Sequence, residues 1–255
     1  MDNGFFGSLI AQILYLTDFG NLSPIYQCFM DGNENAQHNR EAFQLERLML
    51  FTDAVFAIAI TLLAIELKVP ELHHPTEHAA LKGLAILTPR FVGFFLSFFI
   101  IAIYWLAHHR IYRFVIRATP RLLWLNILFL LSIVLMPFTT AYQSEYVMLR
   151  TPWVLYATNI LLIGFVQVRM QFYLRSSIAN VVHPIERQHP DLDPVRPMLS
   201  PFIFLFSISL GFMPIAPPWL LRMTPTLLAP VFYLYQRRYR RLEREYKQQV
   251  DTQLT

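Results

Sequence analysis

The chain has 255 residues, of which 55% are hydrophobic and 15% are charged, with a formal net charge of +4. In ordinary globular domains roughly a quarter of all residues are charged. The low charge of this chain therefore argues against a soluble domain and for a membrane protein. A single cysteine, Cys28, excludes an intrachain disulfide framework and any cysteine pair at metal-binding or redox spacing.

Residues 1–45 are expected to form an N-terminal extension that is interfacial or disordered. They lack the basic residues that precede the apolar run of a secretory signal. The apolar piece at 5–16 is too short to cross about 30 Å of hydrocarbon. The polar run DGNEN at 31–35 predicts a loop. Two interpretations of the extension stay open, a plain terminal segment and a segment that docks on the membrane surface.

Residues 47–65, RLMLFTDAVFAIAITLLAI, predict the first membrane-spanning helix. The part from 54 to 65 carries no charge and would rise about 18 Å at about 1.5 Å per residue. Asp53 therefore stands near the amino end of an apolar helix, where the helix dipole favours a negative charge. Because side chains three and four positions apart share a helix face, one face is expected to carry Ile58, Thr61, Leu62 and Ile65.

Five further apolar segments follow, which makes the expected fold an all-α membrane protein with six transmembrane helices in a domain at 46–236. The sixth segment is the weakest, because prolines interrupt it and only 14 uncharged residues are contiguous at 223–236; including 218–222 makes it long enough to span. The expected spans after the first are 84–107, 122–144, 151–168, 197–221 and 218–236.

Basic residues are concentrated in two places, the link between the second and third spans and the tail at 237–255. By the positive-inside rule, six spans then place both termini in the cytoplasm. Juxtamembrane arginines of this kind mark topology and contact anionic lipid. The expected partner is therefore a lipid bilayer, and nucleic acid is not expected to bind. The link carries Arg110, Arg113, Arg117 and Arg121 without an acidic residue.

Three motifs in order resemble those of the lysosomal potassium channel family, transmembrane protein 175 and its prokaryotic relatives. The first is the pattern Arg-x-x-x-Phe-Ser-Asp before an Ala/Ile-rich helix, matched here by Arg47, Phe51, Thr52 and Asp53. Threonine replaces serine, which keeps the hydroxyl group and adds a methyl. The other two are YWLAHHRIYR at 104–113 and LLWLNILFLLSIVLMPFTTAY at 122–142, and the resemblance covers roughly residues 45–240.

The resemblance implies a pore lined by the first helix of each subunit. By position Ile58 would form the narrowest ring, Leu62 and Ile65 would lie further along, and Thr61 would offer a hydroxyl oxygen to the permeant ion. Taken alone, an Ile/Leu stripe on a membrane helix more often faces lipid or the protein core. No TVGYG-like loop is present, so a carbonyl selectivity filter is not expected. One repeat per chain implies a homotetramer, and the short form implies a prokaryotic plasma membrane.

Asp53 is expected to belong to a structural polar network, since an ionised carboxylate within a span needs partners. The expected partners lie at the same ends of the first three spans; the alternatives are an aspartate capped by water and direct ion binding. Adjacent histidines on a helix point about 100° apart, so no metal site is predicted at the histidine pair. The network would comprise Arg47, Trp105, His108, His109 and Asn126.

The sequence holds no nucleophile elbow, phosphate-binding loop or paired acidic residues within a span, so no enzyme activity and no cofactor are predicted. The favoured function is a homotetrameric, potassium-permeable cation channel with potassium as the permeant ion. The alternative is a non-conducting membrane scaffold or regulatory bundle. A proton-coupled transporter ranks third, because neither broken helices nor inverted repeats are evident.

Overall fold

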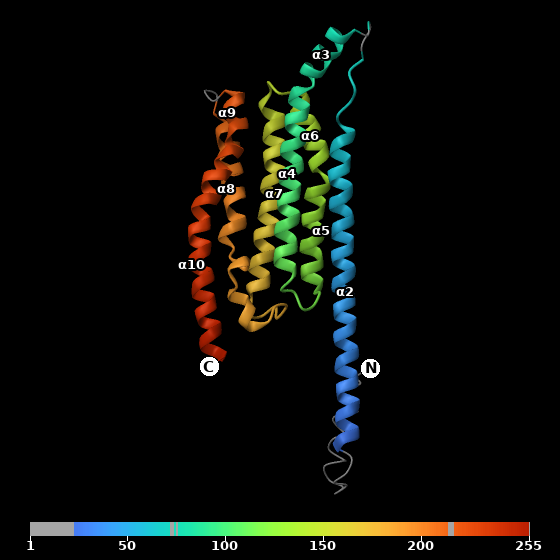
Figure 1. Ribbon diagram of the computed structural model, residues 1–255, viewed down its shortest axis with the longest axis vertical. Coiled ribbons are helices and arrows are strands. Elements are labelled where there is room, and N and C mark those ends of the chain that lie inside the picture. Colours follow the sequence, from blue (N-terminus) through green and yellow to red (C-terminus); the bar gives the residue numbers. More distant parts are fainter. Residues whose placement is uncertain (1–22, 72–73, 75, 214–216, 255) are drawn as a thin grey trace. The chain divides into compact units, whose positions relative to one another are not determined.

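The computed structural model describes residues 23–71, 74, 76–213 and 217–254, and the described chain is almost entirely helical (Figure 1). Its contacts divide the chain into two units, Met1–Phe43 and Gln44–Thr255. The first helix, α2 (Ser23–Ile65), crosses this boundary. The apolar piece expected at 5–16 lies outside the described residues.

The prediction of a loop at 31–35 is wrong, because these residues belong to α2. No proline follows Pro24 within this helix, so nothing in the segment removes a backbone donor. Glycine costs only about 1 kcal/mol in a helix interior, and an existing helix extends at little further cost per residue. The weak local helix propensity of DGNEN is therefore overridden by the helix on either side of it.

Prolines set most of the other helix boundaries. Pro89 stands in the first turn of α4 and Pro137 in the first turn of α6, where a missing N–H group costs nothing. The second span, expected as one helix over 84–107, is accordingly divided at Leu87, and the third is divided at Leu135. The helices are α3 (Glu77–Ile86), α4 (Thr88–Tyr112), α5 (Pro120–Val134), α6 (Met136–Glu145), α7 (Arg150–Arg175), α8 (Val195–Gly211), α9 (Pro218–Met223) and α10 (Leu228–Leu254), with short 3₁₀ turns η1 (Pro184–Gln188), η2 (Pro190–Leu192) and η3 (Thr224–Leu227).

Within the described residues five helical stretches are long and apolar enough to cross a membrane, which confirms an all-α membrane fold. Among the described residues the expected sixth span is divided into α9, η3 and α10 and is not one of these five, so the count of six stays a prediction. The five are Arg40–Ile65, Thr88–Tyr112, Pro120–Glu145, Arg150–Arg175 and Pro190–Gly211.

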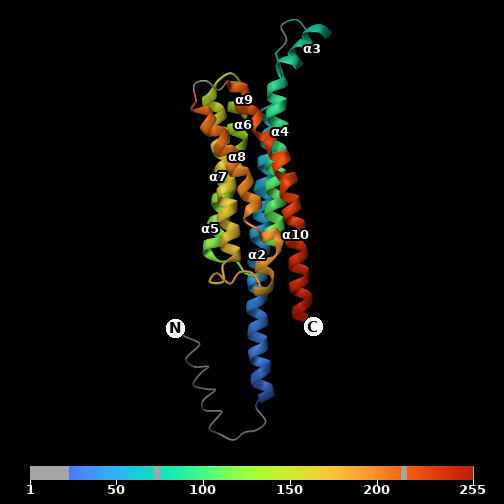
Figure 2. The same ribbon diagram turned by 90° about the vertical axis from the view of Figure 1, so that its left-hand side faces the viewer.

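Within the second unit four helical spans run side by side and alternate in direction: α4, then α5 continued by α6, then α7 and α8 (Figures 1 and 2). Polar contacts mark the two ends of this bundle. At one end, called here the basic end, Arg113 pairs with Asp191 and Arg238 pairs with Asp193. At the opposite end the Arg222 guanidinium donates to the side-chain oxygen of Gln143 at 2.8 Å.

These contacts show where the divided sixth segment runs. Arg222 in α9 lies at the opposite end, whereas the Tyr239 hydroxyl in α10 donates to Asp191 at the basic end, over 3.0 Å. The chain between them therefore passes along the bundle from one end to the other. This course agrees with the sixth crossing that the sequence predicts.

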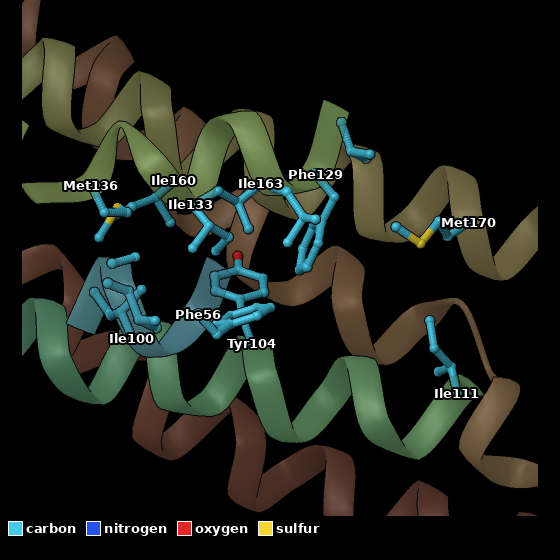
Figure 3. Close-up of a cluster of buried hydrophobic side chains, with 14 of the residues drawn as sticks. Phe56, Ile100, Tyr104, Ile111, Phe129, Ile133, Met136, Ile160, Ile163 and Met170 are labelled. Atoms are coloured by element: carbon cyan, nitrogen blue, oxygen red, sulfur yellow. The ribbon is translucent and has the colours of Figure 1, made fainter. Parts of the chain in front are cut away.

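The core between the helices is apolar and aromatic. Phe56 of α2 and Tyr104 of α4 both approach Phe129 of α5, with ring centroids 5.9 and 6.3 Å away (Figure 3). Fully buried Ile133 and Ile160 extend the cluster towards α6 and α7. This packing places one face of α2 against α4 and α5.

Helices α7 and α8 approach closely at Gly164. A Cβ atom there would lie 2.5 and 2.7 Å from Cγ and Cδ of Pro201, whose ring cannot rotate away. We expect Gly164→Ala to destabilise the fold by about 1–3 kcal/mol, because the two helices must separate. The matched control is Gly211→Ala, whose Cβ would meet chiefly a rotatable methyl of Val154 at 3.0 Å. Equal unfolding temperatures of the two variants in detergent would contradict this interpretation.

Candidate functional site

Helix α2 has two distinct faces within the second unit. Its packed face buries Leu48, Thr52, Phe56, Ala59 and Leu63 against the other helices. The opposite face is left largely uncovered by the residues that the structure describes. It contains the residues predicted to line a pore: Ile58, Leu62 and Ile65 are 58%, 38% and 68% exposed.

Thr61 lies on this same uncovered face. Its hydroxyl group donates to the backbone carbonyl of Ile58 over 2.9 Å. The bond uses the single proton of the hydroxyl and leaves the oxygen lone pairs free to accept. The uncovered face is therefore a hydrophobic stripe on which the hydroxyl oxygen of Thr61 can accept a hydrogen bond.

A chain of hydrogen bonds joins the packed face of α2 to two other helices. Asn126 on α5 accepts from Nε2 of His108 on α4 at 2.8 Å, and its amide group donates to the Thr52 hydroxyl at 2.9 Å. Thr52 in turn donates to the backbone carbonyl of Leu48 at 2.9 Å. The hydrogen bonds all run from His108 through Asn126 and Thr52 towards α2. This direction requires the His108 tautomer with its proton on Nε2.

The rings around His108 hold it in place. It stacks on Tyr112 with centroids 4.0 Å apart and on Phe129 at 5.4 Å. His108, Thr52 and Asn126 are all fully buried. Since buried polar groups are stable only when their hydrogen bonds are satisfied, this chain locks the rotation of α2 relative to α4 and α5.

Asp53 forms a second cluster beside the first. Its carboxylate accepts from Nε1 of Trp105 and interacts with Nε2 of His109, both at 2.9 Å. The Trp105 and His109 rings meet edge to face with centroids 4.7 Å apart. Asp53 therefore joins α2 to α4 through two side chains of the same chain.

Of the predicted network residues, the structure joins Asp53 to Trp105 and His109, and separately joins His108 to Asn126. His109 joins Asp53 and His108 joins Asn126, because neighbouring residues on a helix point in directions about 100° apart. One expected network is thus two adjacent clusters. Arg47 is exposed on α2, and its pairing with Asp53 stays a prediction, as do the roles of the pore-face residues.

Two polar arrangements were not predicted from the sequence. Within the span region, Ser97 shares a hydrogen bond with the Tyr156 hydroxyl at 3.0 Å and accepts one from Thr140 at 2.7 Å. A Cβ atom at Gly93, on the same helix as Ser97, would lie 2.0 Å from Oγ of Ser144, so that hydroxyl group would have to move. Hydroxyl residues scattered through apolar helices carry no signal of this pairing.

The other missed arrangement is at the basic end. Asp191 is buried and pairs with Arg113 and, at 3.8 Å, with Arg110. Burial lowers the pKa of His189, which agrees with a neutral ring whose Nδ1 accepts the backbone N–H of Asp191 at 3.1 Å. Two aspartates in a basic surrounding, Asp191 and Asp193, were the only sequence signal.

An all-helical bundle whose described residues include five stretches long and apolar enough to cross a membrane defines an integral membrane protein. The family model described as the endosomal/lysosomal potassium channel TMEM175 matches residues 47–137. The chain is 32% identical over 176 residues to a potassium channel of Chamaesiphon minutus, which covers 68% of this chain and 86% of that relative. The chain belongs to the TMEM175 family of potassium channels.

Two further comparisons agree with this. The crystal structure of a lysosomal potassium-selective channel TMEM175 homolog from Chamaesiphon minutus superposes with a TM-score of 0.62 at 30% identity, over 75% of this chain and 97% of that one. The endosomal/lysosomal proton channel TMEM175 of Rattus norvegicus is 30% identical over 138 residues, which are 49% of this chain and 27% of the rat protein. The family is one of ion channels and not of enzymes.

Proposed function

We propose that four copies of this chain form a potassium-permeable cation channel whose pore is lined by the uncovered face of α2. Ile58 forms the narrowest ring, with Leu62 and Ile65 further along the pore. Both termini are cytoplasmic, and the membrane is a prokaryotic plasma membrane.

The observation that carries the proposal is the opposition of the two faces of α2. Thr52 and Asp53 on the packed side make polar contacts that fix how the helix is rotated. With that rotation Ile58 and Ile65 point away from the rest of their own subunit. A face held outward by buried polar bonds is suited to a pore shared between subunits, although lipid would also accept an apolar face.

Selection among ions would come from the narrow hydrophobic neck and its polar neighbours. The sequence has no TVGYG-like loop to replace an ion's hydration shell with carbonyl groups. Aliphatic rings hinder hydrated ions by excluding water, and the Thr61 oxygen would assist a partly dehydrated cation. We expect a weak to moderate preference for potassium over sodium.

The rat relative is named a proton channel, so protons are the second candidate for the permeant ion. The buried chain of His108, Asn126 and Thr52 is a directional hydrogen-bond chain but ends on a backbone carbonyl. It therefore offers no onward acceptor within the described residues, and this favours a metal cation along the α2 face.

We expect Ile58→Asn to raise potassium flux or reduce the potassium preference, because an amide group wets the neck. Potassium flux is measured in liposomes that contain the purified protein. Sodium flux and proton flux are measured in the same liposomes for comparison. The matched control is Ile103→Asn on α4, where an isoleucine of similar exposure, 55%, receives the same substitution.

Equal effects of the two substitutions would show that Ile58 does not line the neck. Absence of flux in the unmodified chain and also in Ile58→Asn would favour the non-conducting scaffold instead. Flux of protons without potassium would retain the channel and overturn its proposed ion.

A further inference from the structure

A cavity of about 330 Å³ lies at the basic end, between helices that are distant in sequence. Its lining includes Arg110 from the end of α4 and Arg196 from the first turn of α8. Tyr239 and Gln236 of α10 and Asp191 of η2 also line it. Its volume is at the lower limit of pockets that hold small ligands, about 300–1,000 Å³.

The charges around the cavity do not balance. Asp191 pairs with both Arg113 and Arg110, and Asp193 pairs with Arg238. Four arginines against two aspartates leave a surplus of two positive charges. Glu243 on the next turn of α10 pairs with Lys247 at 3.2 Å and leaves the surplus unchanged. The arginines are Arg110, Arg113, Arg196 and Arg238.

Arg196 accounts for one of these two surplus charges. It is half-buried, and its guanidinium group makes no hydrogen bond or ion pair with any residue that the structure describes. Arg110 and Arg196 repel each other electrostatically. Two arginines held close together at a cavity wall need an anion, and the planar guanidinium fork fits the oxygens of a phosphate group.

The rest of the lining suits a phosphate that is attached to a lipid. The Tyr239 hydroxyl donates to Asp191 at 3.0 Å; burial and this hydrogen bond raise its pKa, so the group stays neutral. Phe232 lies about two turns before Tyr239 on α10 and adds an aromatic ring to the lining. A pocket lined by both arginines and aromatic side chains fits the amphipathic boundary of a membrane.

We propose that this cavity binds the phosphate group of an anionic phospholipid, with Arg196 as the principal ligand and Arg110 as the second. The bound lipid would join α4, α8 and α10 at the side predicted to be cytoplasmic, where basic pockets between membrane helices meet anionic headgroups. This binding does not depend on ion conduction. It can therefore be tested, and can fail, independently of the channel proposal.

The test is a titration of the purified full-length protein in detergent with dioleoyl phosphatidylglycerol, followed by native mass spectrometry. We expect Arg196→Gln to weaken binding about tenfold and Arg196→Lys to weaken it less, because lysine keeps the charge and loses the fork. The matched control is Arg240→Gln, which removes one charge from an exposed position of the same basic tail outside the cavity. It should change the affinity less than about twofold, as expected for an exposed charge.

Equal weakening by Arg196→Gln and Arg240→Gln would show diffuse attraction to the tail and overturn the site. Equal affinity for dioleoyl phosphatidylcholine would overturn the requirement for a net negative lipid. Inorganic phosphate that binds as tightly as the lipid would overturn the lipid assignment in favour of a soluble anion. Selective loss in Arg196→Gln, with neither of the other probes bound, supports the proposal.

Discussion

Asn126→Leu is expected to lower the stability of the subunit by about 3 kcal/mol, in the range for leaving a buried polar group unpaired and losing its bonds. Leucine is close to asparagine in size, so the loss comes from hydrogen bonds and not from a cavity. Nε2 of His108 loses its acceptor and the Thr52 hydroxyl loses its donor. For a chain of this size the unfolding temperature in detergent should fall on the order of 10 °C.

Ser132→Ala is the matched control for this substitution. Ser132 is also buried on α5, but its hydroxyl bonds only to the carbonyl of Leu128 in the same helix, at 3.1 Å. Its loss should cost less than about 1 kcal/mol, because the backbone bond of Leu128 remains. If both variants melt together, the chain of hydrogen bonds does not anchor α2, and the argument for an outward-facing pore stripe loses its support.

Much of the fold was predictable because hydropathy depends on local composition. Five of the expected spans overlap the apolar helical stretches of the structure, although the one expected at 197–221 lies at Pro190–Gly211. The face of α2 that carries Ile58 and Ile65 was also predictable, since helical periodicity groups residues without any knowledge of their neighbours. What periodicity does not reveal is whether such a face meets lipid, core or another subunit.

The sequence was less informative wherever an outcome depended on partners. The loop expected at 31–35 is helical because the flanking segments carry the helix through. His108 and His109 were assigned to one network, yet their partners differ, because the rotation of α4 sends them to different neighbours. The ion pairs of Asp191 join residues far apart in the chain, and a single sequence holds no record of such pairings.

The last prediction, Asp191→Asn, concerns the ion pairs at the basic end. The substitution keeps the size of the side chain and removes the charge that compensates Arg113 and Arg110. Breaking a buried ion pair by removing one partner costs about 3–5 kcal/mol; Arg113 is half-exposed, so about 2–3 kcal/mol is expected here. The loss should appear as faster amide hydrogen exchange in α10, since Tyr239 docks on Asp191.

Glu243→Gln is the control, because its pair with Lys247 is exposed and should be worth less than about 1 kcal/mol. The ion-pair argument and the lipid-binding proposal predict that Asp191→Asn changes stability and lipid affinity in opposite directions. Stability without lipid falls, whereas the affinity for phosphatidylglycerol rises, because the surplus of positive charge beside Arg196 grows from two to three. A variant that is less stable and also binds the lipid more weakly would show that Asp191 shapes the cavity more than it sets its charge, and the electrostatic account of the site would then be wrong.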